Sequence, residues 1–257
     1  MPVLKFSLSD TSMILDSRRY QLEQDMLPAL LRALQTVLPI ERGLLVKTVE
    51  QPAVGAVIPD LLIGLVRRRA AIIARNHFTA VEASVLAFLE REGESEEDGI
   101  CNNLFLPLST WRKVIARLQR VHAVGRTPAG AWRLSESANT SGIEIIAVEA
   151  KLRLWKQALA QAEYYRTFAD RAVVVLDGNR LRVTDRIREA FISASVGLWL
   201  QHGFAVNEIV AAKLLPPPPS GARYNAAEKL LRSRHSIGRY RKPAEAIQRS
   251  YAPSHAR

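Results

Sequence analysis

Residues 142–151 read GIEIIAVEAK and continue directly into LRLWKQALAQAEYY. The apolar run is typical of a buried strand, and the segment after it has helical spacing. Side chains alternate along a strand, so Glu149 and Lys151 project from one face while Val148 and Ala150 point to the other. Charges at the end of a buried strand are costly unless they are paired or bound to something. A structural salt bridge is the simplest interpretation of this pair.

A second apolar run changes that interpretation. The sequence AVIPDLLIGLV at 56–66 carries a single acid, Asp60, and Pro59 predicts a bulge or distortion there. If the two runs are neighbouring strands, Asp60 and Glu149 can meet, and adjacent carboxylates repel each other unless a cation lies between them. Such oxygen ligands suit Mg²⁺, which takes one or two carboxylates and keeps several waters. Lys151 would then hold a water or stabilise charge on a phosphate. The three residues predict a site that cuts phosphodiester bonds.

This motif resembles that of the PD-(D/E)XK nuclease superfamily, which has the restriction-endonuclease-like fold. Pro59-Asp60 matches the PD part of the motif, and Glu149-Ala150-Lys151 matches the ExK part. The expected order of elements is also similar: a leading helix, a strand hairpin with the Asp, the ExK strand, a helix and another strand. The resemblance implies Mg²⁺ (or Mn²⁺) bound by Asp60 and Glu149, with Lys151 orienting the attacking water.

The resemblance also implies contributions from two helices. In that family the leading helix often supplies an acid, and Glu23 is the best match because it shares a face with three leucines of the expected helix 16–38. Glu23 is therefore expected to be a third metal ligand. Some branches place a Gln or Tyr on the helix after the ExK strand, expected here at 152–169. The candidates are Gln157 and Gln161, one turn apart, followed by Tyr164 or Tyr165.

Between Asp60 and Glu149 lies a unit that resembles a winged helix-turn-helix, at residues 76–136. We expect helices at 80–91, around 100–104 and at 110–120, with Thr79 and Ser109 as N-caps, and a hairpin at 121–135. Helix-turn-helix docking would make 110–120 the recognition helix. Its cations predict contacts to DNA phosphates and bases, and the alternative is a protein-binding unit with solvated arginines. They are Arg112, Lys113, Arg117 and Arg120, with Arg126 and Arg133 on the wing.

These patterns divide the chain into three parts. Residues 1–75 and 137–215 are expected to form a discontinuous α/β core, a restriction-endonuclease-like mixed sheet flanked by helices. Residues 76–136 form the inserted winged-helix unit. Residues 216–257 form a proline spacer and a basic tail.

The tail is the most basic segment. From residue 221 onward it has nine Lys and Arg against two Asp and Glu, and it holds at most one short helix, at 225–234. Its arginines either clamp a nucleic-acid backbone or belong to a disordered, solubilising tail. They include Arg223, Arg232, Arg234, Arg239 and Arg241.

Composition narrows the classes of function. The 257 residues carry 36 Lys and Arg against 25 Asp and Glu, a formal charge of +11 that fits a polyanionic partner. Cys101 is the only cysteine, which excludes an intramolecular disulfide and a Cys-rich zinc site. The histidines lack metal-ligand spacing, and no Gly-rich phosphate loop is present. Without a signal-peptide core or an apolar stretch of membrane-spanning length, we expect a cytoplasmic protein that does not bind membranes.

We therefore expect a Mg²⁺- or Mn²⁺-dependent endonuclease that cuts DNA, with the winged helix positioning a duplex. Two alternatives stay open. One is a catalytically inactive, nuclease-like protein that binds DNA or acts as an adaptor in a larger nucleic-acid-processing complex. The other is a protein-interaction subunit without DNA affinity of its own. RNA as the substrate and pairing of two chains as a homodimer also stay open.

Overall fold

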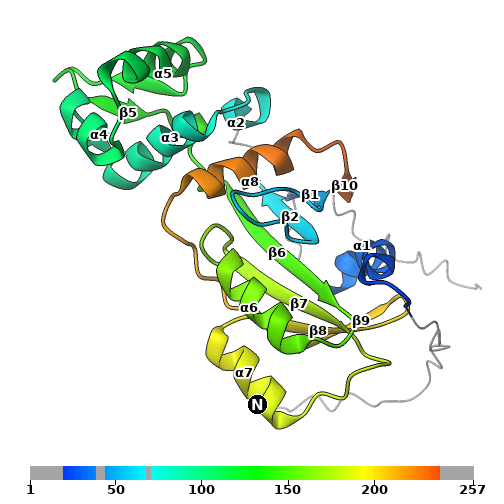
Figure 1. Ribbon diagram of the computed structural model, residues 1–257. Helices are drawn as coiled ribbons and strands as arrows, with labels where there is room; N and C mark the ends of the chain where they lie inside the picture. Colours follow the sequence, from blue (N-terminus) through cyan, green and yellow to red (C-terminus); the bar gives the residue numbers. More distant parts are fainter. Residues whose placement is uncertain (1–19, 39–43, 68–70, 238–257) are drawn as a thin grey trace, which may run out of the picture.

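The computed structural model describes residues 20–38, 44–67 and 71–237 (Figure 1). A mixed seven-stranded sheet runs through the molecule in the order β10-β1-β2-β6-β7-β8-β9. β1, β2 and β6 are antiparallel neighbours, β6, β7 and β8 are parallel, and β9 returns antiparallel to β8. The strands are β1 Leu45–Glu50, β2 Leu61–Val66, β6 Ile143–Lys151, β7 Arg171–Asp177, β8 Gly197–His202, β9 Ala205–Val210 and β10 Ser236–Ile237. The expected α/β class with a mixed sheet is confirmed.

Helices cover both faces of the sheet, so β6 is buried on both sides and residues 145–148 are apolar without alternation. One face packs against α6 (Trp155–Tyr165), α7 (Asp185–Ala194) and α8 (Gly221–Arg232), and we call it the α6 face. The opposite face, the α1 face, packs against the 3₁₀ turn η1 (Glu23–Met26) and α1 (Leu27–Val37). No helix in the described ranges is long and apolar enough to cross a membrane.

Several expected boundaries move. The leading helix is split into η1 and α1 near Pro28, whose missing N–H suits the first turn of a helix; the expected caps at Asp16 and Ser17 lie outside the described residues. β2 begins only at Leu61, so Pro59 precedes the strand and causes no bulge within it. α6 is shorter than 152–169 at both ends.

The unit at residues 76–136 lies in the chain between β2 and β6. It contains α3 (Ala80–Glu92), α4 (Glu97–Leu104) and α5 (Leu108–Arg120), preceded by α2 (Ala71–Arg75). Its own small sheet has the order β3-β5-β4, from β3 (Glu94–Ser95), β4 (Val124–Arg126) and β5 (Trp132–Leu134), and η2 (Glu136–Ala138) follows. Figure 1 shows the unit projecting from one end of the sheet.

Of the two N-caps predicted for this unit, Thr79 is confirmed and Ser109 is wrong. Thr79 caps α3 by accepting from the N–H of Glu82. Ser109 is not a cap, because Pro107 fills that place and its carbonyl accepts from the N–H groups of Thr110 and Trp111. Trp111 is fully buried, edge-on to Trp132 at 5.9 Å between ring centroids, as expected of a core residue.

Part of the expected basic tail belongs to the fold. Helix α8 begins at Gly221 because Ser220 caps it, and it lies across β1 and β2 on the α6 face while also packing against α3 (Figure 1). It fits closely over Gly64, where an added Cβ would lie 3.0 Å from Leu230. The helix expected at 225–234 thus begins earlier, at Gly221, and packs into the fold. Arg223, only 5% exposed, is neither solvated nor free to clamp DNA. Arg239 and Arg241 lie outside the described residues.

Candidate active site

The register between β2 and β6 brings Asp60 next to the ExK residues. Leu61 pairs with Val148, so Asp60, one residue before β2, lies beside Glu149. The N–H of Ala150 donates to Oδ2 of Asp60 at 2.8 Å, which fixes the carboxylate against the end of β6. The two acids that the sequence placed in separate runs are thus neighbours at one end of the sheet.

Lys151 lies at the centre of this group. Its Nζ is 2.7 Å from Oε1 of Glu149 and 3.0 Å from Oε2 of Glu23, which comes from η1. The Lys151 side chain is 12% exposed and that of Glu149 is 3% exposed, so the Glu149–Lys151 ion pair is largely shielded from water. The salt bridge considered from the sequence therefore exists, but as part of a larger arrangement that also includes Asp60.

Helix α6 adds a phenol that the sequence narrowed to two positions. The hydroxyl of Tyr165 donates to Oε2 of Glu149 at 2.5 Å, whereas Tyr164 is exposed to solvent. Gln161 lies one turn before Tyr165 and is partly buried, with no hydrogen bond to its Oε1 within the described ranges. Gln157 is exposed to solvent on the first half of α6. We define the carboxylate cluster as Glu23, Asp60, Glu149, Lys151 and Tyr165.

Burial and mutual charge shift the titration of the cluster. Burial raises the pKa of Asp60 despite its bond from Ala150, and Glu23 raises it further. Burial also raises the pKa of Glu149, against the hydrogen bonds from Lys151 and Tyr165, and Asp60 adds to the rise. Burial alone would lower the pKa of Lys151, but its carboxylate partners outweigh this and raise it. Burial and Glu149 raise the pKa of Tyr165, so it stays a neutral donor.

The donor set can be compared with the needs of a metal ion. Within the described residues, no group of three His, Cys, Asp or Glu side chains is arranged to hold one. Asp60 and Glu149 nevertheless present two oxygen donors at one place, which is the number that Mg²⁺ commonly takes from a protein while keeping several waters. Glu23 faces the ammonium of Lys151. Asp60 and Glu149 are therefore the residues that would hold a Mg²⁺, although both oxygens of Glu149 are already bonded, to Lys151 and to Tyr165. Glu23 pairs with Lys151, so the structure does not present it as the expected third ligand.

Helix α5 of the inserted unit exposes a cationic face. Its buried stripe of Trp111, Val114, Ile115 and Leu118 leaves Arg112, Lys113 and Arg120 exposed. Arg117 is different: its guanidinium pairs with the buried carboxylate of Glu82 and donates to the carbonyl of His77, so it ties α5 to α3. On the hairpin, Arg126 stacks over Trp132 at 4.4 Å and Arg133 is exposed. Five of the six cations predicted to contact DNA are thus exposed, whereas Arg117, with a side chain 38% exposed, is bonded to Glu82 of α3.

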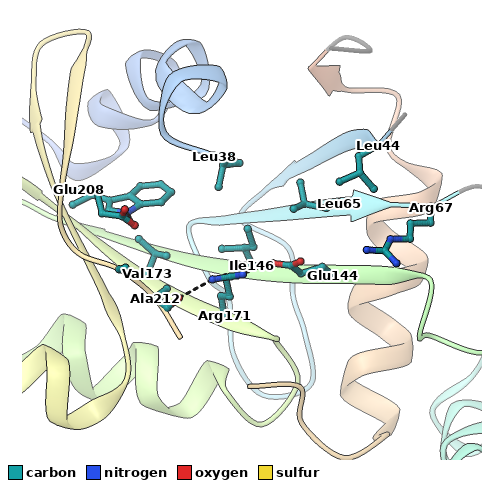
Figure 2. A pocket seen from close by; sticks show the side chains of 12 residues that line it. Leu38, Leu44, Leu65, Arg67, Glu144, Ile146, Arg171, Val173, Glu208 and Ala212 are labelled. Carbon is teal, nitrogen blue, oxygen red and sulfur yellow. Dashed lines mark hydrogen bonds and ion pairs between the residues drawn. The ribbon is translucent and has the colours of Figure 1, made fainter. Parts of the chain in front are cut away.

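A cavity of about 330 Å³ lies elsewhere, on the α1 face of the sheet (Figure 2). Its apolar wall includes Ile146, Val173 and Trp199, and the Glu144–Arg171 ion pair, 2.7 Å long, lies in its floor. No residue of the carboxylate cluster lines it. The cluster lies apart from this cavity, at the end of β2 and β6, and its Glu149 and Tyr165 are buried.

Comparison of the chain with protein-family models, with curated proteins and with solved structures gives no significant match. The chemistry of the cluster is set by its own residues: carboxylates that can hold a cation, an ammonium that can donate to a water or a phosphate, and a phenol that fixes one carboxylate. Sequence reasoning missed the network around Arg223, although a buried helix after the prolines was signalled by the Ser220 cap and the apolar residues Ala226, Ala227 and Leu230.

Proposed function

We propose that this chain is a metal-dependent DNA endonuclease of the PD-(D/E)XK type. The observation that carries the proposal is the meeting of Asp60 with Glu149 and Lys151, with the Ala150 N–H bonded to Asp60 at 2.8 Å. The order α1, β1, β2, β6, α6, β7 supports it, because it is the order that the resemblance to the superfamily implies. The shared end of β2 and β6 is then the place where a phosphodiester is cut.

Asp60 and Glu149 would hold Mg²⁺ (or Mn²⁺), which supplies Lewis-acid polarisation of the phosphate and a water of lowered pKa. The ammonium of Lys151 orients the attacking water and stabilises charge that develops on the phosphate. Glu23 holds Lys151 from the other side at 3.0 Å, which fixes the ammonium between two carboxylates. Tyr165 holds Oε2 of Glu149, so that this carboxylate keeps one orientation.

The inserted unit would position the duplex as a winged helix-turn-helix. Its three helices and its small sheet of order β3-β5-β4 support this interpretation. Arg112, Lys113 and Arg120 on α5 would enter or border a groove of the duplex, with Arg126 and Arg133 of the hairpin on the adjacent backbone. Arg117 would act indirectly, by holding α5 against α3 through Glu82.

Plasmid nicking tests the proposal. Supercoiled DNA is incubated with Mg²⁺, with Mn²⁺ and with EDTA, using the wild type and the variants Asp60→Asn, Lys151→Ala and Glu189→Ala. Glu189 is an exposed acid on α7 and serves as the control. We expect nicking only with a metal ion, and we expect Asp60→Asn and Lys151→Ala each to lower the nicking rate by about 100-fold or more. Equal rates for Asp60→Asn, Lys151→Ala and Glu189→Ala would show that the site is elsewhere.

A second candidate is a DNA-binding or adaptor protein that no longer cuts. The observation that favours it is the completeness of the ion pairs, since Lys151 already bonds Glu149 and Glu23. It predicts salt-sensitive DNA binding in EDTA without nicking under any metal condition. A protein-interaction subunit would show neither, so a gel shift beside the nicking assay separates the three functions.

A further inference from the structure

A second polar surface lies on the outer side of α8. It is a groove of about 870 Å³ between the C-terminal half of α8, the end of β1 and the loop that follows β1. We call it the α8 groove. Its cationic or titratable residues are His77, Lys229, Arg232, Arg234 and His235, and its acids are Glu50 and Glu228.

One of the two acids of this groove, Glu228, is already bonded within the protein. The side chain of Glu228 is 6% exposed; its carboxylate lies 2.5 Å from Nδ1 of His77 and accepts from the N–H of Phe78 at 3.0 Å. Arg232 adds a looser contact of 3.4 Å but is half exposed. Lys229 and Arg234 make no ion pair with a described residue. The surface that meets solvent is therefore cationic, with Glu50 at its edge.

The groove adjoins the carboxylate cluster. The N–H of Gln51, which lines the groove, donates to the backbone carbonyl of Asp60 at 2.9 Å. Gln51 is therefore directly across from Asp60, at the spacing of adjacent strands. On its other side the groove is bounded by His77, which precedes Thr79, the cap of α3 in the inserted unit. The α8 groove thus lies between the cluster and the inserted unit, along one side of the molecule.

We propose that the α8 groove binds the phosphate backbone of duplex DNA beside the cutting site, through Lys229, Arg232 and Arg234. Lys229 and Arg232 are three residues apart and so lie on the same side of the helix. A backbone that passes Asp60 reaches Gln51 next and then these cations. The inference rests on the proposed function, because it takes DNA to be the polyanion that binds. The surface it assigns is separate from the carboxylate cluster and from helix α5.

Fluorescence anisotropy with a labelled duplex tests this in EDTA, so that binding is measured without cleavage. Arg232→Gln/Arg234→Gln is compared with the control Arg186→Gln/Arg188→Gln, which makes the same charge change on exposed positions of α7. Each lost phosphate contact lowers the slope of log affinity against log salt by about 0.9. For two contacts we expect a slope lower by about 1.8 and affinity about 30-fold weaker at 0.15 M salt. The affinity of the control pair for the duplex should fall by less than threefold.

Three results would overturn the assignment. The first is an equal loss of affinity in both pairs, which would mean a general effect of net charge. The second is unchanged affinity and slope in the α8 pair. The third is tight binding of the wild type to duplex RNA and not to DNA. Lys229→Gln is a second variant, expected to lower the slope by about 0.9. Urea midpoints check that each variant is folded.

The binding and nicking assays together distinguish a failure of the α8 groove from a failure of the proposed nuclease function. Nicking abolished by Asp60→Asn, together with unchanged binding of the α8 pair, would reject the groove and leave the nuclease. Groove-dependent binding without nicking by the wild type would support the groove and reject the nuclease.

Discussion

Replacing Arg223 should strongly destabilise the protein, although it lies in a segment whose composition suggested a solvated tail. Arg223 is 5% exposed, and its guanidinium pairs with Asp170, itself 4% exposed, at 3.0 Å. The other partners are acceptors at the ends of elements around β6 and β7: Oγ1 of Thr140 at 3.0 Å and the carbonyls of Phe168 and Ile143 at 3.2 and 3.1 Å. One side chain of α8 therefore joins several segments of the sheet layer.

The expected loss of stability depends on which buried groups remain unpaired after Arg223 is replaced. Arg223→Met keeps much of the apolar volume but leaves Asp170 as a buried charge whose remaining bond is from the N–H of Ile145, at 2.7 Å. Breaking a buried ion pair on one side costs about 3–5 kcal/mol, and three further acceptors lose their donor. We expect the free energy of unfolding to fall by at least about 3 kcal/mol, a large share of the stability of a typical domain.

Urea denaturation of Arg223→Met, Asp170→Asn and the double variant measures the pair as a cycle. Because the double variant no longer buries an unpaired charge, it should be more stable than the sum of the single effects implies, by about 2 kcal/mol. Arg232→Gln, on the exposed side of the same helix, is the control and should change the free energy of unfolding by less than about 1 kcal/mol. A loss below 1 kcal/mol in Arg223→Met would contradict the anchoring of α8.

Two further changes probe the cluster and the inserted unit. Tyr165→Phe removes the 2.5 Å hydrogen bond to Glu149. We therefore expect the free energy of unfolding, measured in urea, to fall by about 1.5–3 kcal/mol, and nicking to be slower. No change in either measurement would show that the bond is unimportant. Phe105→Gly should raise the free energy of unfolding by about 0.5–1 kcal/mol, because Phe105 has φ 52° and is 91% exposed. A fall in stability would mean that its ring makes a contact that the exposure does not show.

The strands around the cluster could be predicted because their signals are local. The continuous apolar run before Glu149 and the single acid in the run after Pro59 indicated two central strands, and their antiparallel register places Asp60 beside Glu149. The choice between Tyr164 and Tyr165 could not be made in the same way. Adjacent residues of a helix point about 100° apart, and α6 begins three residues later than expected, at Trp155.

Interactions between distant segments were the part that the sequence did not reveal. Arg117 was placed among DNA contacts because it lies on a basic helix, but it flanks the buried stripe of α5 and meets Glu82 of α3. Arg223 was counted in a basic tail because net charge does not distinguish a solvated arginine from one that satisfies buried acceptors. In both cases a buried carboxylate requires a cation, and only the fold shows which one.

Helix α8 also determines how the two proposed DNA-binding parts are held. Thr140, whose hydroxyl accepts from Arg223, donates both its N–H and its hydroxyl to Oε1 of Glu90 on α3, at 2.9 and 3.0 Å. Gly221 packs against α3 so closely that an added Cβ would lie 3.3 Å from Oγ of Ser84. These contacts join α3 of the inserted unit to α8 and to the segment before β6. The distance from α5 to the carboxylate cluster is therefore fixed by packing, so a nuclease built this way should cut at a constant offset from the DNA that α5 contacts.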